Sequence, residues 1–332
     1  MEDLGNAFIW LGPLSALLSS LTWAVGSETY SRLSHRNSAF RINFTRASVA
    51  LPMFLLMAIS LHGVESVHAI TLQHVGWLLL SMIASYGLAD FLFLTSTRDL
   101  GVPGALSVAS IYPIWTVLLG VIRGDQWLRP VQWLGLVLTL GGVIFTVLAG
   151  AQTGGKSAAL QGRTVRGVLF ASITSFLWAM NSFSVAQAGS DLPVHWVNVI
   201  RMALALAFCG LVGWWSEGRR SVARSETGVS WRPWLRDANV GRSFWVFPFE
   251  AFGGSLFFAY GLAHSPLALG STLSSLAPVL AVPLAWINRS EEISFRRAFG
   301  VIAVVVGVAL LLGGGVNPSS GALQVENMGN GR

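Results

Sequence analysis

The sequence predicts an all-α integral membrane protein in which ten transmembrane helices form two inverted five-helix repeats. Three observations predict this fold: an apolar composition, ten apolar segments of membrane-spanning length, and an internal repeat. Of the 332 residues, 53% are hydrophobic and only 11% are charged, and the mean hydropathy is +0.61. Soluble domains carry about 25% charged residues. Side chains this apolar are therefore expected to face lipid.

The predicted spans are segments of about 20 apolar residues, the length that a helix needs to cross a bilayer. The longest connection, 216–243, is basic and contains Trp231 and Trp234, so we expect it at the membrane interface. Residues 315–332 are rich in Gly, Ser and Asn and are expected to form a flexible tail. The ten predicted spans are 9–31, 41–62, 74–97, 102–122, 131–151, 165–187, 194–215, 244–264, 267–288 and 296–314.

An internal repeat relates the first five spans to the last five. The stretch SLTWAVGS, which begins at Ser20, returns as SFLWAMNS, which begins at Ser175, at an offset of 155 residues. The later helices match at an offset of 165. The ordered matches predict one five-helix repeat over 9–151 and a second over 165–314. Further matched pairs are Asn43 and Asn198, Arg46 and Arg201, Phe93 and Phe258, Ser110 and Ser275, Pro113 and Pro278, Gly135 and Gly300, and Gly142 and Gly307.

Five is an odd number, so the second repeat enters the membrane from the opposite side. Inverted repeats of this kind are common in secondary transporters. The loops after the odd-numbered spans hold most of the arginines, whereas the remaining loops and the tail hold only Arg123, Arg129 and Arg332. Positively charged loops stay in the cytoplasm. We therefore expect a multi-pass protein of the cell membrane with both termini on the non-cytoplasmic side.

Other features of the chain argue against several classes of protein. The formal charge of +6 comes almost entirely from loop arginines, so nucleic-acid binding is not predicted. Cys209 is the only cysteine, which excludes an intrachain disulfide and a cysteine-cluster metal site. His62, His68 and His74 lack cysteine or carboxylate partners at ligand spacing, so we expect no metal and no cofactor. We find no phosphate-binding loop and no nucleophile–base pair.

One face of the first span and one face of the sixth span carry a tryptophan between small hydroxyl side chains. Trp23, Ser27 and Tyr30 lie along one stripe of the first span. Trp178 and Ser182 form the equivalent stripe in the second repeat. Small residues let helices approach closely, and a tryptophan can also form the wall of a cavity that receives a cation or an apolar body. Both interpretations stay open, and both suit different positions of one stripe.

Five charged residues fall inside or beside the predicted spans. A charge inside a bilayer costs at least about 2.5 kcal/mol on insertion scales, so it is rarely without a role. In a structural interpretation, Arg46 pairs with Glu28 or Asp90, and Arg201 extends toward the interface. In a functional interpretation, Asp90 or Glu28 binds a proton or a cation, and the arginines act as gates or anion anchors. The five candidate coupling or gating charges are Glu28, Arg46, Asp90, Arg201 and Glu250.

Two prolines and several polar or aromatic residues complete the set of candidates. Pro113 and Pro278 are equivalent residues in the middle of their spans, where proline kinks a helix. These kinks either shape a cavity or follow simply from the geometry of the fold. The remaining candidates for a substrate cavity are Tyr86, Tyr112, Trp115, Asn181 and Tyr260.

Together these motifs resemble the drug/metabolite transporter superfamily, with two EamA-like units over about 9–314. The resemblance rests on the openings LTWAVGS and FLWAMNS, and on Arg46 and Arg201 early in the second helix of each unit. It rests also on the fourth-helix patterns SVASIYPIWTVLLGVI and STLSSLAPVLAVPLAWI and on the paired glycines of the fifth helices. It implies ten helices around a central cavity, alternating access, and export or exchange of small polar or amphipathic solutes.

The chain departs from the family pattern at two points. Relatives often have an acid after the fourth helix of each unit; here the second unit keeps Glu291, and the first offers Asp125 in RGDQW. Many relatives are drawn with both termini inside, whereas the loop charges of this chain place them outside.

We expect a secondary transporter that exports or exchanges small metabolites, such as amino acids or organic cations. A channel, a scramblase or a non-transporting sensor is the alternative, and a membrane-embedded enzyme is a weaker one. The expected partners are a small-molecule substrate and the lipid bilayer. We expect a monomer, because the duplicated chain already contains both halves of the fold.

Overall fold

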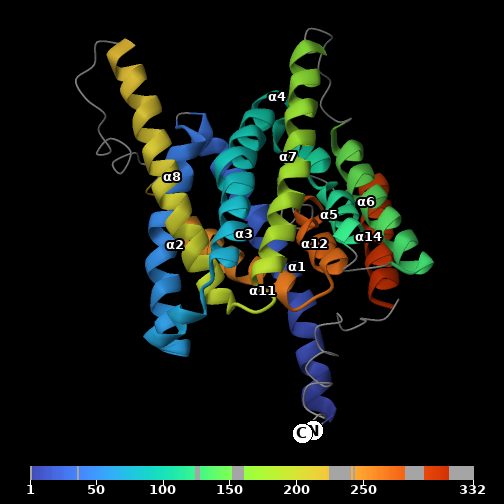
Figure 1. Cartoon of the computed structure of the whole chain (residues 1–332). Coiled ribbons are helices and arrows are strands. Elements are labelled where there is room, and N and C mark those ends of the chain that lie inside the picture. Colours follow the sequence, from blue (N-terminus) through green and yellow to red (C-terminus); the bar gives the residue numbers. More distant parts are fainter. Residues whose placement is uncertain are drawn as a thin grey trace, which may run out of the picture.

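The computed structural model describes residues 2–35, 37–123, 128–151, 161–223, 241, 244–280 and 295–313. Every regular element within these residues is a helix, which confirms the predicted all-α fold (Figure 1). Several sequence-based predictions lie outside the described residues. They concern the tail at 315–332, the interfacial segment with Trp231 and Trp234, and the acids Asp125 and Glu291.

The first repeat begins with two long helices and continues through interrupted ones. Ser38 caps α2, because its Oγ accepts a hydrogen bond from the Arg41 backbone N–H at 3.2 Å. Gly101, with φ 74° and ψ 164°, separates the third predicted span from the fourth within α4. A positive φ of this size favours glycine. The elements are α1 (Glu2–Ser34), α2 (Ala39–His62), the 3₁₀ turn η1 (Val64–Ala69), α3 (Leu72–Met82), the π-helix η2 (Ile83–Ala89), α4 (Asp90–Ala109), α5 (Tyr112–Arg123) and α6 (Pro130–Ala151).

The described elements of the second repeat follow the same order as their equivalents in the first. Its π-helix η4 lies at the position of η2 when the two repeats are compared at an offset of 165 residues. The apolar pattern predicts ordinary α-helix over both stretches and gives no sign of the π-helices. Short π-helical stretches occur frequently at functional sites. The elements are α7 (Gln161–Ala188), α8 (Val194–Ala223), η4 (Phe247–Gly254), α11 (Ser255–Ala263), α12 (Leu267–Ser274) and α14 (Phe295–Gly313).

The equivalent prolines follow equivalent interruptions of the helix. The helix is broken at Ser110 and Ile111, shortly before Pro113. The chain is likewise non-helical at Ser275, shortly before Pro278. Proline has no backbone N–H to donate to the preceding turn, so a break on its N-terminal side is the expected result.

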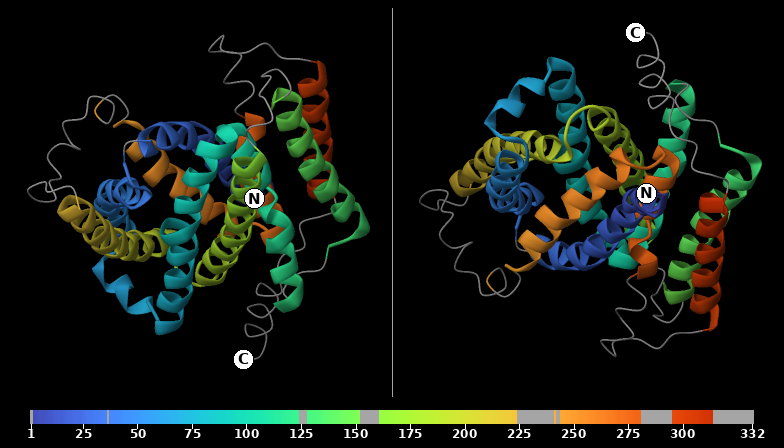
Figure 2. Two further views of the ribbon diagram at one scale, coloured as in Figure 1. Left: turned by 90° about the horizontal axis from the view of Figure 1, so that it is seen from above. Right: turned by 90° about the horizontal axis from the view of Figure 1, so that it is seen from below.

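Equivalent helices of the two repeats make equivalent contacts. Helix α1 packs against η4, α11 and α12, and its equivalent α7 packs against η2 and α4, which hold the equivalent positions in the first repeat. The helices α2 and α8 pack against each other, as do α6 and α14 (Figure 2). In Figure 1, α1 runs upward from the N-terminus whereas α7 runs downward. The chain therefore has the predicted inverted two-repeat membrane fold.

Glycines allow α6 and α14 to pack closely. A Cβ atom added at Gly135 would lie 2.7 Å from the carbonyl oxygen of Gly307, and one added at Gly142 would lie 2.8 Å from that of Gly300. These distances are too short for any side chain. The two pairs of glycines that mark the repeat in the sequence thus meet crosswise, so that the first glycine of each helix contacts the second glycine of the other.

Four helices in the described residues are long and apolar enough to cross a membrane: Ala39–His62, Leu72–Val102, Thr164–Ala188 and Val194–Ser216. Shorter apolar helices cover Tyr112–Arg123, Pro130–Phe145, Leu267–Leu280 and Ile302–Leu311. Helix α1 covers the first predicted span without interruption, whereas a helix break at Ser110 and Ile111 divides the fourth and the π-helix η4 lies within the eighth. The protein is therefore a multi-pass membrane protein.

Candidate functional site

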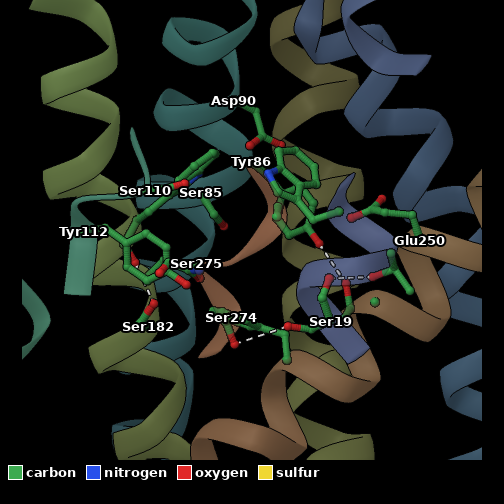
Figure 3. Close-up of a pocket in the computed structure, with 18 of the residues that line it drawn as sticks. Ser19, Ser85, Tyr86, Asp90, Ser110, Tyr112, Ser182, Glu250, Ser274 and Ser275 are labelled. Atoms are coloured by element: carbon green, nitrogen blue, oxygen red, sulfur yellow. Dashed lines mark hydrogen bonds between the residues drawn. The ribbon is translucent and has the colours of Figure 1, made fainter. Parts of the chain in front are cut away.

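A cavity lies where the two repeats meet, and helices from both repeats line it (Figure 3). The space between its lining atoms, counted out to its mouth, is about 720 Å³. The wall of the cavity combines small hydroxyl side chains, aromatic rings and four charged groups.

Arg46 on α2 is held between two carboxylates that come from different repeats. Its Nη1 donates to Asp90 Oδ2 at 2.6 Å, and its Nη2 and Nε donate to the two oxygens of Glu250 at 2.9 and 3.1 Å. Asn43, one turn earlier, accepts from Nη1 at 2.9 Å. The three charged side chains are each exposed by 8% or less. Bidentate arginine–carboxylate contacts are among the strongest hydrogen bonds in proteins. With two acids and one arginine, the cluster carries a formal charge of −1.

Glu250 reaches Arg46 because α1 leaves room for it. A Cβ atom added at Gly26 would lie only 2.6 Å from Glu250 Cγ. Tyr30, one turn further along α1, donates its hydroxyl hydrogen to Glu250 Oε2 at 2.7 Å. Gly26, which corresponds to Asn181 in the second motif, therefore makes space for Glu250 from the second repeat.

Arg201 on α8 is the equivalent of Arg46, but its hydrogen-bond acceptors are neutral. It donates from Nε to Ser81 Oγ at 3.0 Å, from Nη1 to Asn198 Oδ1 at 3.2 Å, and from Nη2 to Asn181 Oδ1 at 3.1 Å. Within the described residues, no carboxylate lies within ion-pair distance of this guanidinium. Its side chain is nevertheless buried, since Arg201 is only 3% exposed.

The ring of Tyr86, from η2, lies close to both arginines. The guanidinium carbon of Arg46 lies 4.9 Å from the centre of the Tyr86 ring, and that of Arg201 lies 5.7 Å from it. An aromatic face attracts a cation. The ring therefore interacts favourably with both positive charges.

The two repeated tryptophans contact each other beside the charged groups. The rings of Trp23 and Trp178 meet edge to face with centroids 5.7 Å apart. Trp178 also meets Tyr112 edge to face at 6.1 Å, and Arg46 lies 5.6 Å from the centre of the Trp23 ring. The two repeated motifs, which contain Trp23 and Trp178, thus form one aromatic wall of the cavity.

The structure brings most of the predicted residues to this cavity. Ser182 lines it and donates to the Trp178 carbonyl at 2.8 Å. Pro113 and Pro278 do not line the cavity. Each follows a helix break, and the serines at these breaks, Ser110 and Ser275, line the cavity. The predicted residues that line the cavity are Trp23, Arg46, Tyr86, Asp90, Tyr112, Trp178, Asn181, Ser182, Arg201 and Glu250.

Other predicted residues lie elsewhere. The Glu28 side chain is 64% exposed and lies 3.7 Å from Arg32, because its position on α1 faces away from the cavity. Trp115 is 41% exposed and packs on Phe176.

Three further candidates are close to the cavity wall or to the helix ends but do not line it. Tyr260 stacks on His264 near the end of α11. Ser27 and Tyr30 are buried behind the wall, where Ser27 donates to the Ala24 carbonyl at 3.3 Å.

The loop histidines also lie outside the cavity. His74 Nε2 lies 2.9 Å from Asp191 Oδ1, and His62 Nε2 lies 3.1 Å from His195 Nδ1. Across the part of the chain that the structure describes, no group of three or more His, Cys, Asp or Glu side chains could hold a metal ion.

Apart from Ser182, the small hydroxyl residues of the cavity were not among the predicted site residues. Comparing the repeats at an offset of 165 residues would have found two of them, because Ser85 matches Glu250 and Ser255 matches Asp90. Ser19 and Ser274 bond to each other at 3.2 Å at one end of the cavity (Figure 3). Single serines in apolar helices are too common to mark a site by themselves.

Comparison with known proteins agrees with this architecture. The family model described as the EamA-like transporter family matches residues 10–148 and 165–313. An "Uncharacterized transporter" from Archaeoglobus fulgidus is 25% identical over 300 residues, which cover 90% of this chain and 97% of the relative. A solved crystal structure has the same fold, with a TM-score of 0.66 and 18% identity over 92% of this chain and 96% of its own. Because the family model matches both repeats over most of the chain, the protein belongs to the EamA-like transporter family, within the drug/metabolite transporter superfamily.

Proposed function

We propose that the protein is a secondary transporter that exports or exchanges small polar or amphipathic solutes, and that the central cavity is its substrate site. The observation that carries this proposal is that both repeats line one cavity. In inverted-repeat transporters the binding site lies at the interface between repeats, and rocking of one half against the other exposes it to alternate sides.

Buried charge supports the same proposal. Arg46, Asp90, Arg201 and Glu250 line the cavity although the surrounding helices are apolar. Ionisable residues inside transmembrane segments are expensive and mark substrate or ion pathways. A channel would place such groups along a continuous pore, whereas here they gather in one compact site.

Solute counterflow tests the proposal. A panel of amino acids, organic cations, purines and sugar phosphates is first screened for stabilisation of the purified protein. A solute at a hundred times its dissociation constant adds about 2.7 kcal/mol when it binds only the folded state. Proteoliposomes loaded with an unlabelled hit should then accumulate the labelled form transiently. Uptake without stimulation by internal solute would indicate a channel, and chemical alteration of the solute would indicate an enzyme.

Two tryptophans provide a matched pair of variants for this assay. Trp178→Ala removes a ring from the cavity wall and should reduce exchange at least about tenfold, which corresponds to 1.4 kcal/mol of lost interaction. Trp115→Ala removes a ring that lies outside the cavity and should exchange solute nearly as the wild type does. Equal effects of the two substitutions would contradict the placement of the substrate in the cavity.

We also propose that the arginine-rich end of the molecule is cytoplasmic and that the protein functions as a monomer. Arg98 bonds to the Ser34 carbonyl and Arg166 to Asp99, so the ends of the first, third and sixth spans lie together. An added N-terminal cysteine should react with an impermeant thiol reagent on intact cells if the termini are outside. Protection of that cysteine would reverse the orientation.

A further inference from the structure

The two arginines of the cavity differ because the acids around Arg46 have no acidic counterparts around Arg201. The position equivalent to Asp90 is Ser255, and the position equivalent to Glu250 is Ser85. Both serines line the cavity. Both repeats therefore have the arginine and its asparagine, but the positions equivalent to the two carboxylates around Arg46 carry hydroxyl groups around Arg201.

This replacement leaves the buried Arg201 without a carboxylate at ion-pair distance among the described residues. An arginine side chain has five N–H donors. The hydrogen bonds to Ser81, Asn198 and Asn181 use one hydrogen on each nitrogen of Arg201. Among the described residues, one hydrogen on each terminal nitrogen has no acceptor. A buried charge is costly unless it is paired.

We propose that Arg201 anchors a carboxylate group of the transported solute. This inference rests on the proposed transport function. Arg201 lines the cavity, and its two remaining N–H groups come from adjacent nitrogens of a planar fork. A carboxylate accepts two parallel hydrogen bonds from such a fork. The solute would supply the charge that Asp90 and Glu250 supply to Arg46.

The charge balance of the cavity favours a monoanionic group over a phosphate. Asp90 and Glu250 already neutralise Arg46 and leave a charge of −1 near it, so Arg201 is the single positive charge available to a solute. A phosphate dianion would add a second negative charge with no described partner. A carboxylate adds one, and a solute that also carries a cationic group would keep the cavity neutral.

A pair of small probes tests the anchor on the purified full-length protein without knowledge of the natural solute. Sodium propionate carries the carboxylate, and propionamide has the same shape without the charge. Replacing sodium chloride by about 100 mM propionate should raise the melting temperature of the wild type, because a ligand of the folded state stabilises it. Propionamide should not do so. Equal responses to the two probes would overturn the proposal.

Variants locate the response. Arg201→Gln should remove the effect of propionate, whereas Arg32→Gln, at an exposed arginine on α1, should retain it. Ser255→Asp introduces the acid that the first repeat has at Asp90, and it should weaken propionate affinity at least about tenfold. Ser255→Asn adds similar bulk without charge and should weaken it less. A propionate response that survives Arg201→Gln, or equal losses in the two Ser255 variants, would overturn the anchor.

Counterflow separates the failure of this inference from the failure of the proposed function. If the wild type exchanges amines that lack a carboxylate and Arg201→Gln exchanges them equally well, transport stands and the anchor does not. If no solute of the panel shows exchange while propionate still stabilises the wild type in an Arg201-dependent manner, the anchor stands and transport does not.

Discussion

Arg46 and Arg201 occupy equivalent positions in the two repeats, and each bonds to an asparagine three residues earlier in its own helix, at 2.9 and 3.2 Å. Around Arg46 the remaining acceptors are carboxylates, whereas around Arg201 they are a serine and an amide. The difference arises at four pairs of equivalent positions: Gly26 and Asn181, Asp90 and Ser255, Glu250 and Ser85, and Val246 and Ser81.

The comparison shows how a duplicated fold acquires an asymmetric site. The arginine–asparagine pair, the π-helices and the proline breaks occur in both repeats and form the scaffold. The acids occur on one side only. In one half of the cavity the arginine is therefore paired with carboxylates of the protein, whereas the arginine of the other half has no carboxylate at ion-pair distance among the described residues.

The largest effect is expected from removing the charge of Arg46. Arg46→Gln leaves Asp90 and Glu250 buried without a counter-charge, and breaking a buried pair in this way costs about 3–5 kcal/mol. The unfolding temperature of the purified protein in detergent should fall steeply. Arg201→Gln removes a charge that has no described carboxylate, so its unfolding temperature should fall little or rise. Similar decreases in unfolding temperature for the two variants would mean that the two arginines contribute equally to stability.

A smaller loss is expected from closing the space at Gly26. Gly26→Ala places a Cβ 2.6 Å from Glu250 Cγ, and overpacking of this kind costs about 1–3 kcal/mol. It should also move Glu250 away from Arg46 and lower exchange. Gly76→Ala is the control, because an added Cβ there meets nothing within 4 Å. If both variants unfold like the wild type, Gly26 does not provide the room for Glu250.

Asp90→Asn is expected to change transport more than stability. Asparagine keeps an acceptor for Arg46 but removes the charge, so we expect a loss of about 1–2 kcal/mol, below that of an unpaired buried charge. We propose that the cluster of two acids and one arginine binds one proton during transport. Asp90→Asn makes the cluster permanently neutral, and exchange should lose its response to an imposed pH gradient. An unchanged response would leave Asp90 as a counter-ion of Arg46 alone.

The helices, the duplication and most cavity residues follow from the sequence because they depend on local rules. Apolar length fixes the spans, an odd number of spans fixes the inversion, and a repeated motif brings Trp23 and Trp178 together. The partners of Arg46 do not follow, since Glu250 lies 204 residues away and reaches it through a space left by Gly26. The rotation of each helix about its axis decides such contacts, and π-helices shift that rotation within a span.

Glu28 is where the expected effect is smallest, and it provides the sharpest control for the acid cluster. By sequence Glu28 and Asp90 are equivalent candidates, because both are acids inside predicted spans. In the structure the Glu28 side chain is 64% exposed and lies 3.7 Å from Arg32, one turn further along α1. Exposed pairs of this kind contribute little to stability. Glu28→Gln should therefore match the wild type in unfolding temperature, exchange rate and pH response, measured beside Asp90→Asn. A pH response lost in Glu28→Gln and kept in Asp90→Asn would move the proton site from the cavity to the end of α1.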